Sequence, residues 1–171
     1  MWARKDLHVT KGLNREILLA ELKRDEGVRL KAYKDTVGKL TIGTGRNLDD
    51  VGLLASEIAR GMTLSSVKRF GVTMAQNDMM LDNDIDRTEA DLDRKLPWWR
   101  TLDEVRQRVL VNMAFNLGIT GLLGFKNTLA LIKAGKFIQA SENMLKSKWA
   151  TQVGQRAIRL ATLMELGVRK V

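Results

Sequence analysis

The scarcity of helix breakers constrains the fold of this chain more than any other feature of its sequence. Among its 171 residues there is a single proline, Pro97, and long stretches contain no breaker at all. Proline removes a backbone hydrogen bond and ends or kinks a helix, so a chain that almost lacks it favours long helices. The sequence therefore predicts a predominantly α-helical protein.

Capping signals indicate where two of these helices begin. Asn14 is a suitable N-cap for a helix that runs to about Asp25. Thr73 and Gln76 have the spacing of a capping box, which predicts a helix from about Met74 to Lys95 that ends before Pro97. We expect inward-facing side chains at Ile17, Leu18, Leu19 and Leu22 in the first helix, and at Met79, Ile85 and Leu92 in the second.

A central buried helix is expected next. Thr101 and Glu104 have capping-box spacing, and apolar residues then recur at helical intervals up to Gly118, which would end the helix. The residues of this stripe are Leu102, Val105, Val109, Leu110, Met113, Ala114 and Leu117. Shorter helices are predicted at about 126–134, 137–148 and 155–166.

Residues 30–45 break the helical pattern. They combine strand-forming residues with a turn glycine, Gly38, which predicts a β-hairpin. Residues 46–72 read as a loop followed by short helical pieces around Gly61 and Gly71. The fold class expected is therefore α+β, predominantly α-helical.

The amino-acid composition excludes several kinds of site. The chain has no cysteine and one histidine, His8. It therefore has no disulfide, no thiolate zinc site and no cysteine nucleophile, and too few histidines for a histidine metal site. We predict no metal and no cofactor. The longest apolar runs fall far short of the ~20 residues of a membrane span, and no secretory signal is evident, so we expect a cytoplasmic chain without stable membrane insertion.

The charge is large and unevenly distributed. Lys and Arg number 29 against 20 Asp and Glu, which gives a net charge of +9. Residues 78–93 carry a net −6, whereas residues 146–171 carry +5. A basic chain prefers an anionic partner such as nucleic acid, anionic lipid or a cell-wall polymer. No DNA-binding motif is present and the acidic segment argues against a nucleic-acid surface, so that alternative is the weaker one.

Two carboxylates, Glu26 and Asp35, are candidates for catalysis because they lie near the predicted hairpin. Glu26 ends the first predicted helix, and Asp35 lies beside the hairpin with Thr41 on the returning strand. A carboxylic acid and a carboxylate that face one cleft are the minimum requirement for glycoside hydrolysis. With 20 acidic residues in the chain, this spacing alone is weak evidence.

The whole segment from Asp25 to Gly45 resembles the active-site segment of the phage-type lysozymes, the endolysins of T-even and related bacteriophages (glycoside hydrolase family 24). The shared pattern is Glu-Gly, a basic and apolar run, Tyr-x-Asp, a glycine turn and Thr-Ile-Gly-x-Gly. Residues 112–129 are similar to the central helix of the family and its following turn, and residues 146–156 to its C-terminal region. The resemblance covers about residues 15–167.

The resemblance implies a site and its roles. Glu26 would be the general acid, Asp35 and Thr41 would hold the attacking water, and Arg156 would pair with Glu26. Substrate-binding positions implied by the family are Phe115, Asn116, Thr128 and Asn143. Two residues depart from the family pattern: Arg46 stands where histidine is frequent, and Asn47 where an apolar residue is frequent.

The resemblance also implies an architecture. We expect an N-terminal extension over residues 1–14 and a single lysozyme-like domain over residues 15–171. Its parts would be a small α+β lobe (about 26–72), a bridging helix (about 74–95), and a larger helical lobe (about 96–171) that includes the first helix.

The activity implied is an endolysin that hydrolyses, with inversion, the β-1,4 bond between N-acetylmuramic acid and N-acetylglucosamine of peptidoglycan. It would act as a monomer and wait in the host cytoplasm for a membrane lesion. Two alternatives remain: a lytic transglycosylase, which forms 1,6-anhydro products, and an inert lysozyme fold with a structural role in a virion.

Overall fold

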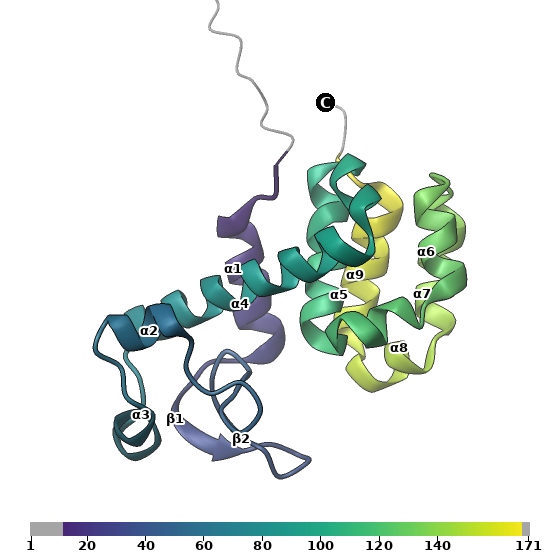
Figure 1. Ribbon diagram of the computed structural model, residues 1–171. Coiled ribbons are helices and arrows are strands. Elements are labelled where there is room, and N and C mark those ends of the chain that lie inside the picture. Colours follow the sequence, from purple (N-terminus) through teal and green to yellow (C-terminus); the bar gives the residue numbers. More distant parts are fainter. Residues whose placement is uncertain (1–11, 169–171) are drawn as a thin grey trace, which may run out of the picture.

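The computed structural model describes residues 12–168 and shows two lobes joined by one long helix (Figure 1). The small lobe contains a three-stranded sheet, whereas the larger lobe consists of helices. This confirms the predicted class, a predominantly helical α+β fold. Residues 1–11, which make up most of the predicted extension and include His8, lie outside the described residues.

The small lobe is built on the predicted hairpin. Strands β1 (Arg29–Lys34) and β2 (Leu40–Gly43) pair antiparallel, and a short third strand, β3 (Arg46–Asn47), adds to β2. Helices α2 (Ala55–Ala59) and α3 (Leu64–Phe70) complete the lobe, in the region where short helical pieces were expected. Its buried apolar core consists of Ile42, Leu48, Met62, Val67, Val72 and Met80.

Helix α4 (Met74–Lys95) joins the two lobes and has the predicted bounds. The predicted capping box is present, because Thr73 accepts a hydrogen bond from the Gln76 N–H and Gln76 accepts one from the Thr73 N–H. Met80 contributes to the core of the small lobe, whereas Leu81, Ile85 and Leu92 belong to the larger core. The helix therefore shares its apolar face between the two lobes. A 3-10 turn, η1 (Pro97–Thr101), follows it.

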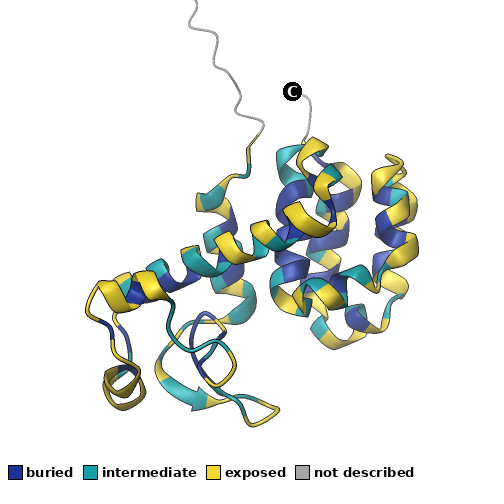
Figure 2. Cartoon of the chain, in the orientation of Figure 1, coloured by how far each residue is buried: buried dark blue, intermediate teal, exposed yellow. Residues whose placement is uncertain are grey.

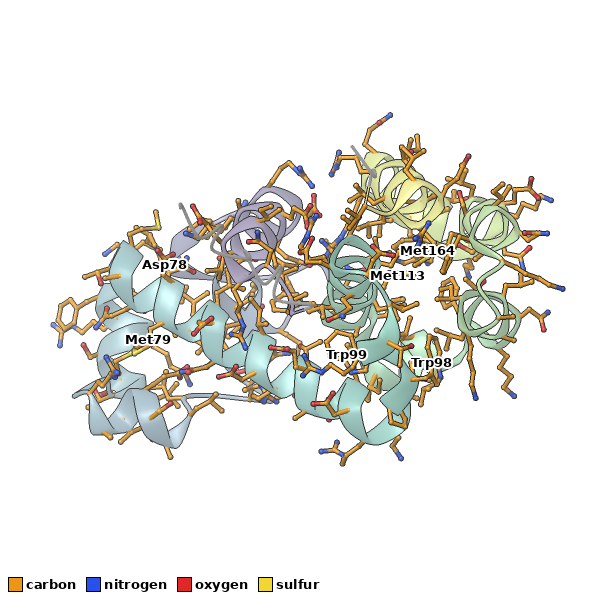
Figure 3. All side chains as sticks on the ribbon, turned by 90° about the horizontal axis from the view of Figure 1, so that it is seen from above. Asp78, Met79, Trp98, Trp99, Met113 and Met164 are labelled. Carbon is orange, nitrogen blue, oxygen red and sulfur yellow. The ribbon has the colours of Figure 1, made fainter. Side chains whose placement is uncertain are left out.

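The helical lobe is assembled around α5 (Glu104–Leu123), which is buried on nearly all sides between residues 107 and 114 (Figure 2). Helices α6 (Lys126–Lys133), α7 (Phe137–Lys146), α8 (Lys148–Val153) and α9 (Gln155–Leu166) follow. Helix α9 packs on α5, and Met113 and Met164 belong to their shared core (Figure 3). The first helix, α1 (Arg15–Glu26), adds Leu18 and Leu22 to this core.

Three sequence expectations about the helices were wrong. Thr101 does not cap α5: its hydroxyl donates to the Trp98 carbonyl within η1, and Asp103 caps the helix instead. The helix predicted over about 137–148 ends at Lys146, because the backbone at Ser147 is extended, and Ser147 caps a further helix, α8, that was not predicted. Ile17 is 43% exposed, since the buried stripe of α1 runs through Leu18 and Leu22.

Gly118 interrupts α5 as expected, but the helix resumes beyond it as far as Leu123. The interruption is a single residue with non-helical backbone angles. Met79, expected to face inward, is only partly buried against the small-lobe core.

The acidic face of α4 is not merely solvated. Arg15 pairs with Asp82, Asp86 and Glu89, and Arg100 pairs with Glu89 and Asp93. Lys23 from α1 pairs with Asp78. Arginine and lysine side chains from neighbouring elements therefore neutralise most of the acidic segment.

Within the described part of the chain, no single helix is long and apolar enough to cross a membrane. The bent pair formed by α5 and α6 meets the length and composition criteria only when the two helices are taken together.

Candidate active site

Glu26 is the last residue of α1 and points toward the turn that follows β2. Its side chain is 20% exposed. The backbone of Gly45 in that turn has φ +76°, a conformation that disfavours a side chain, and a β-carbon there would lie 3.4 Å from Glu26 Oε2. The backbone conformation of the turn therefore favours glycine here, and the turn lies against one side of the carboxyl group.

Arg156 of α9 lies against the same carboxyl group. Its Nη1 atom is 2.7 Å from Glu26 Oε1, and the guanidinium is buried. Asn112, in the middle of α5, accepts a hydrogen bond from Arg156 Nε at 2.9 Å. The two helices of the larger lobe thus fix the position of the arginine, and the arginine in turn orients Glu26.

Asp25 is a second anchor of this cluster. Its side chain is 1% exposed, and it accepts hydrogen bonds from Asn112 Nδ2 at 3.0 Å and Arg159 Nη2 at 2.7 Å. Burial by itself would raise the pKa of Asp25, but hydrogen bonds from Arg24, Asn112 and Arg159 outweigh it, so its pKa lies below the ordinary value. Asp25 therefore stays charged beside Arg156.

The sequence analysis assigned no role to Asp25 or Asn112. A signal was available, because Asn112 is a polar residue inside an otherwise apolar helical stripe. A buried amide needs hydrogen-bond partners, and here those partners are the residues that hold Glu26.

Asp35 and Thr41 lie together at the hairpin, on either side of Lys39. Asp35 Oδ1 accepts hydrogen bonds from the N–H groups of Val37 and Lys39, at 3.0 and 2.9 Å. The Thr41 hydroxyl, on β2, donates to the Lys39 carbonyl at 3.2 Å. Within residues 12–168, Asp35 Oδ2 has no protein hydrogen-bond donor, so this oxygen is available to water.

A hollow of about 280 Å³ lies next to the Glu26 corner. Its walls are the turn at Gly45, Arg46 and Asn47, the 84–91 flank of α4, and α5 around Phe115 and Gly118. It therefore lies where the two lobes meet. Gly45, a neighbour of Glu26, lines it, whereas Glu26, Asp35 and Thr41 are not among its lining residues.

The four substrate-binding positions implied by the family are distributed differently around this hollow. Phe115 lines it. Asn116 is exposed and accepts a hydrogen bond from Trp149 Nε1 at 2.8 Å. Thr128, on α6, is buried, and Asn143, on α7, is partly buried; neither lines the hollow. Their contact with a sugar therefore stays a prediction.

Arg46 forms the floor of the hollow and is buried with two carboxylates. Its Nη1 and Nη2 atoms bind Glu57 at 2.9 and 2.8 Å, and Nε binds Asp84 at 2.8 Å. The carbonyls of Gly52 and Met80 accept its remaining two N–H groups. All five guanidinium donors are therefore satisfied, and the turn beside Glu26 is fastened to α2 and α4.

The two carboxylates of this cluster respond differently to burial. For Glu57, burial raises the pKa, but bonds from Arg46, Asn83 and the Leu54 N–H outweigh this effect and lower it overall. For Asp84, burial raises the pKa more than Arg46 and Arg87 lower it. Arg46 itself has a raised pKa, because its carboxylate partners outweigh its burial. The sequence analysis noted Arg46 only as a departure from the family.

The described residues contain no group of three or more His, Cys, Asp or Glu side chains that could hold a metal ion. The arrangement instead offers a carboxyl group beside an arginine, and a second carboxylate with a hydroxyl group across the small lobe. That combination suits acid–base chemistry on a glycosidic bond.

Comparison with known proteins decides the family. Residues 23–165 match the family described as phage lysozyme. This chain belongs to that family. The matched segment contains Glu26, Asp35, Thr41 and Arg156. The protein is accordingly a lysozyme, a glycosidase that hydrolyses peptidoglycan.

Individual relatives agree with this assignment. Probable T4-type lysozyme 2 of Dictyostelium discoideum is 30% identical over 159 residues, covering 87% of this chain and 94% of that protein. Probable T4-type lysozyme 1 of the same organism is 28% identical over 156 residues, covering 85% and 92%. The pre-baseplate central spike protein Gp5 of Enterobacteria phage T4 is 30% identical over 171 residues, covering 90% of this lysozyme but only 28% of Gp5.

Proposed function

We propose that this lysozyme is an endolysin that cleaves, with inversion, the β-1,4 bond between N-acetylmuramic acid and N-acetylglucosamine and thereby lyses its host. The observation that carries the proposal is the position of Glu26. Its carboxyl group is held by Arg156 at 2.7 Å and lies next to Gly45, which lines the hollow between the lobes.

In this proposal Glu26 protonates the oxygen of the leaving sugar. Asp35 Oδ2 accepts a proton from the attacking water, and Thr41 Oγ1 accepts its second hydrogen bond, since this hydroxyl group already donates to the Lys39 carbonyl. The water attacks from the face opposite the leaving group, which inverts the anomeric carbon. The Lys39 backbone is hydrogen-bonded to both side chains, through Asp35 Oδ1 and Thr41 Oγ1, so a rigid hairpin turn would position the water.

The same proposal covers location and partners. The enzyme would act as a monomer on anionic peptidoglycan, stay in the host cytoplasm, and reach the wall after the membrane is permeabilised. The net charge of +9 supports attraction to an anionic wall. The match to Gp5 keeps a virion-associated role as the competing possibility.

The test is a reducing-end assay on purified peptidoglycan with wild type beside Glu26→Gln. Loss of the proton donor should reduce the rate at least about 100-fold, because general acid catalysis contributes that much or more. Glu16→Gln is a matched control, since Glu16 is an exposed glutamate on the same helix. A fully active, folded Glu26→Gln would exclude Glu26 as the acid.

Product analysis then separates hydrolysis from transglycosylation. Hydrolysis yields a free reducing end, and inversion yields it first as the α-anomer, which proton NMR detects. A 1,6-anhydro product would instead show that no water is used, and Asp35 and Thr41 would then have no water to hold.

A further inference from the structure

The tip of the small lobe exposes large apolar side chains. Ile58 is 57% exposed, Leu64 38%, Phe70 62% and Met74 49%. These four account for a large share of the exposed large apolar side chains among the described residues, yet they fall within one short segment of the chain. Clusters of this kind on a soluble domain mark interaction surfaces. Figure 2 shows α3 exposed along most of its length.

An apolar hollow accompanies these side chains. It measures about 220 Å³ and lies between the end of α2 and the first turns of α4. Met62, Ala75 and Met79 line it, with Arg60 and Gln76 at its margin. Figure 3 places Met79 at the opposite end of α4 from Trp98 and Trp99, and therefore far from the helical lobe.

The same tip is basic. Lys31 donates to the Phe70 carbonyl at 2.6 Å, and the Arg69 guanidinium lies 5.1 Å from the centre of the Phe70 ring. Arg60, which follows α2, and Lys68, on α3, are also exposed. Within residues 12–168, none of these four cations forms an ion pair, in contrast to the neutralised acidic face of α4.

Residues 55–76 contain no exposed acid, and the partly exposed Asp78 that follows them is paired with Lys23 of α1. The one acidic residue between positions 55 and 76 is Glu57, which is fully buried against Arg46. We define the basic apolar tip as Lys31, Ile58, Arg60, Leu64, Lys68, Arg69, Phe70 and Met74. Its charge is complementary to an anionic surface. Transfer of its apolar side chains from water to a less polar environment would lower the free energy.

We propose that the basic apolar tip docks reversibly onto the surface of an anionic phospholipid bilayer. Anionic headgroups attract lysine and arginine, and aromatic and aliphatic side chains enter the interface between headgroups and acyl chains. A nucleic acid or a wall polymer would use the cations alone and leave Phe70 and Leu64 in water. This docking goes beyond the glycosidase activity and does not depend on Glu26.

The test is co-sedimentation of the full chain with vesicles of phosphatidylcholine alone or of equal parts phosphatidylcholine and phosphatidylglycerol. We expect partition at least about tenfold higher onto the anionic vesicles at about 0.05 M salt. Glu26→Gln should bind like wild type, so failure of the proposed catalytic role and failure of docking are distinguishable.

Two variants and one control separate the contribution of charge to membrane binding from that of apolar contact. Lys68→Glu with Arg69→Glu should lower partition about tenfold, whereas Lys133→Glu with Lys136→Glu, an equal charge change on exposed lysines of the helical lobe, should lower it much less. Phe70→Ser should lower partition several-fold, and its effect should persist at about 0.5 M salt, where charge attraction is screened. Because these side chains are exposed, each variant should keep the wild-type circular dichroism, and the two double variants, which change the net charge equally, should have equal lytic rates.

Each contrary result overturns the proposal. Equal binding to both vesicle types, or no binding, excludes an anionic membrane partner. Equal losses in the two charge-reversal variants would show that net charge alone acts. Unchanged partition of Phe70→Ser would show that the tip binds polyanions rather than a bilayer interface.

Discussion

At the scale of single residues, the site depends on charged groups that are buried and fully paired. Arg156 and Asp25 hold the corner at Glu26, and Arg46 fastens the turn beside it. Burying a charge costs much free energy unless its partners compensate. Removal of one partner leaves an unpaired buried charge and therefore destabilises the fold. Two predictions follow from this dependence.

Arg46→Met should destabilise the protein by about 3–5 kcal/mol, because Glu57 and Asp84 would lose their buried partner. Arg87→Met is the matched control: Arg87 also binds Asp84 but its side chain is 50% exposed, so its loss should cost about 0–1 kcal/mol. Urea unfolding of both variants measures the difference. Similar losses of unfolding free energy would show that the buried ion pairs of Arg46 stabilise the protein no more than the exposed ion pair of Arg87.

Asp25→Asn should lose stability in a pH-dependent way. The pKa of Asp25 in the folded protein lies below its ordinary value of 3.8, so the unfolded chain takes up the proton first as the pH falls. Its contribution is therefore complete above that ordinary value and disappears as the pH falls through the folded-state pKa. Thermal unfolding from pH 7 to pH 2.5 should show the variant approaching wild type at the acidic end. A constant difference would contradict this linkage.

At the scale of secondary-structure elements, the local patterns were strong enough to place most helices. The capping box at Thr73 and the proline at 97 gave α4 its bounds, because both act within a few residues. The predicted start of α5 was wrong, because the Thr101 hydroxyl donates a hydrogen bond to the Trp98 carbonyl within η1 and does not cap α5. Helix spacing does not reveal this contact. The hairpin was predictable, whereas β3 forms only because the turn folds back on β2.

Connections between elements also impose steric demands. Gly71 ends α3 with φ +85°, and a β-carbon there would lie 2.1 Å from the Leu30 carbonyl oxygen of β1. Gly61 has a similar φ of +87° but open space around it. Gly71→Ala should therefore cost about 2–5 kcal/mol, from strain and overpacking together, and Gly61→Ala only about 1–2 kcal/mol from strain. Denaturant unfolding of the pair tests whether α3 is held this tightly to β1; equal costs would show that the contact relaxes.

At the scale of the whole molecule, the two lobes have cores of unequal size. Among residues 12–168, the larger core contains 22 buried residues, whereas the small-lobe core contains six. Local stability follows buried apolar contact, so the small lobe should open more easily than the whole protein unfolds. Helix α1 precedes the small lobe in the chain but packs with the larger core, and ion pairs of Asp25 and Glu26 join it to α9.

Native-state hydrogen exchange should show this difference. Amides of β1 and β2 should exchange with a lower opening free energy than those of α5 and α9, which should approach the free energy of global unfolding. Ile42→Val, in the small core, should lower the opening free energy of the β1 and β2 amides more than that of the α5 and α9 amides. If all amides exchanged through a single global opening, the two lobes would form one cooperative unit.

The sequence by itself determined the helical class, the hairpin, the bounds of α4 and α9, and the segment that carries Glu26, Asp35 and Thr41. These features are encoded within short stretches, where capping, periodicity and a contiguous motif suffice. Only the tertiary structure decided that Asp25 and Asn112 support Arg156, that Arg46 binds Glu57 and Asp84, and that the acidic face of α4 is neutralised. A buried charge is stable only with its partners, and these partners come from other elements of the fold, which local sequence patterns do not place.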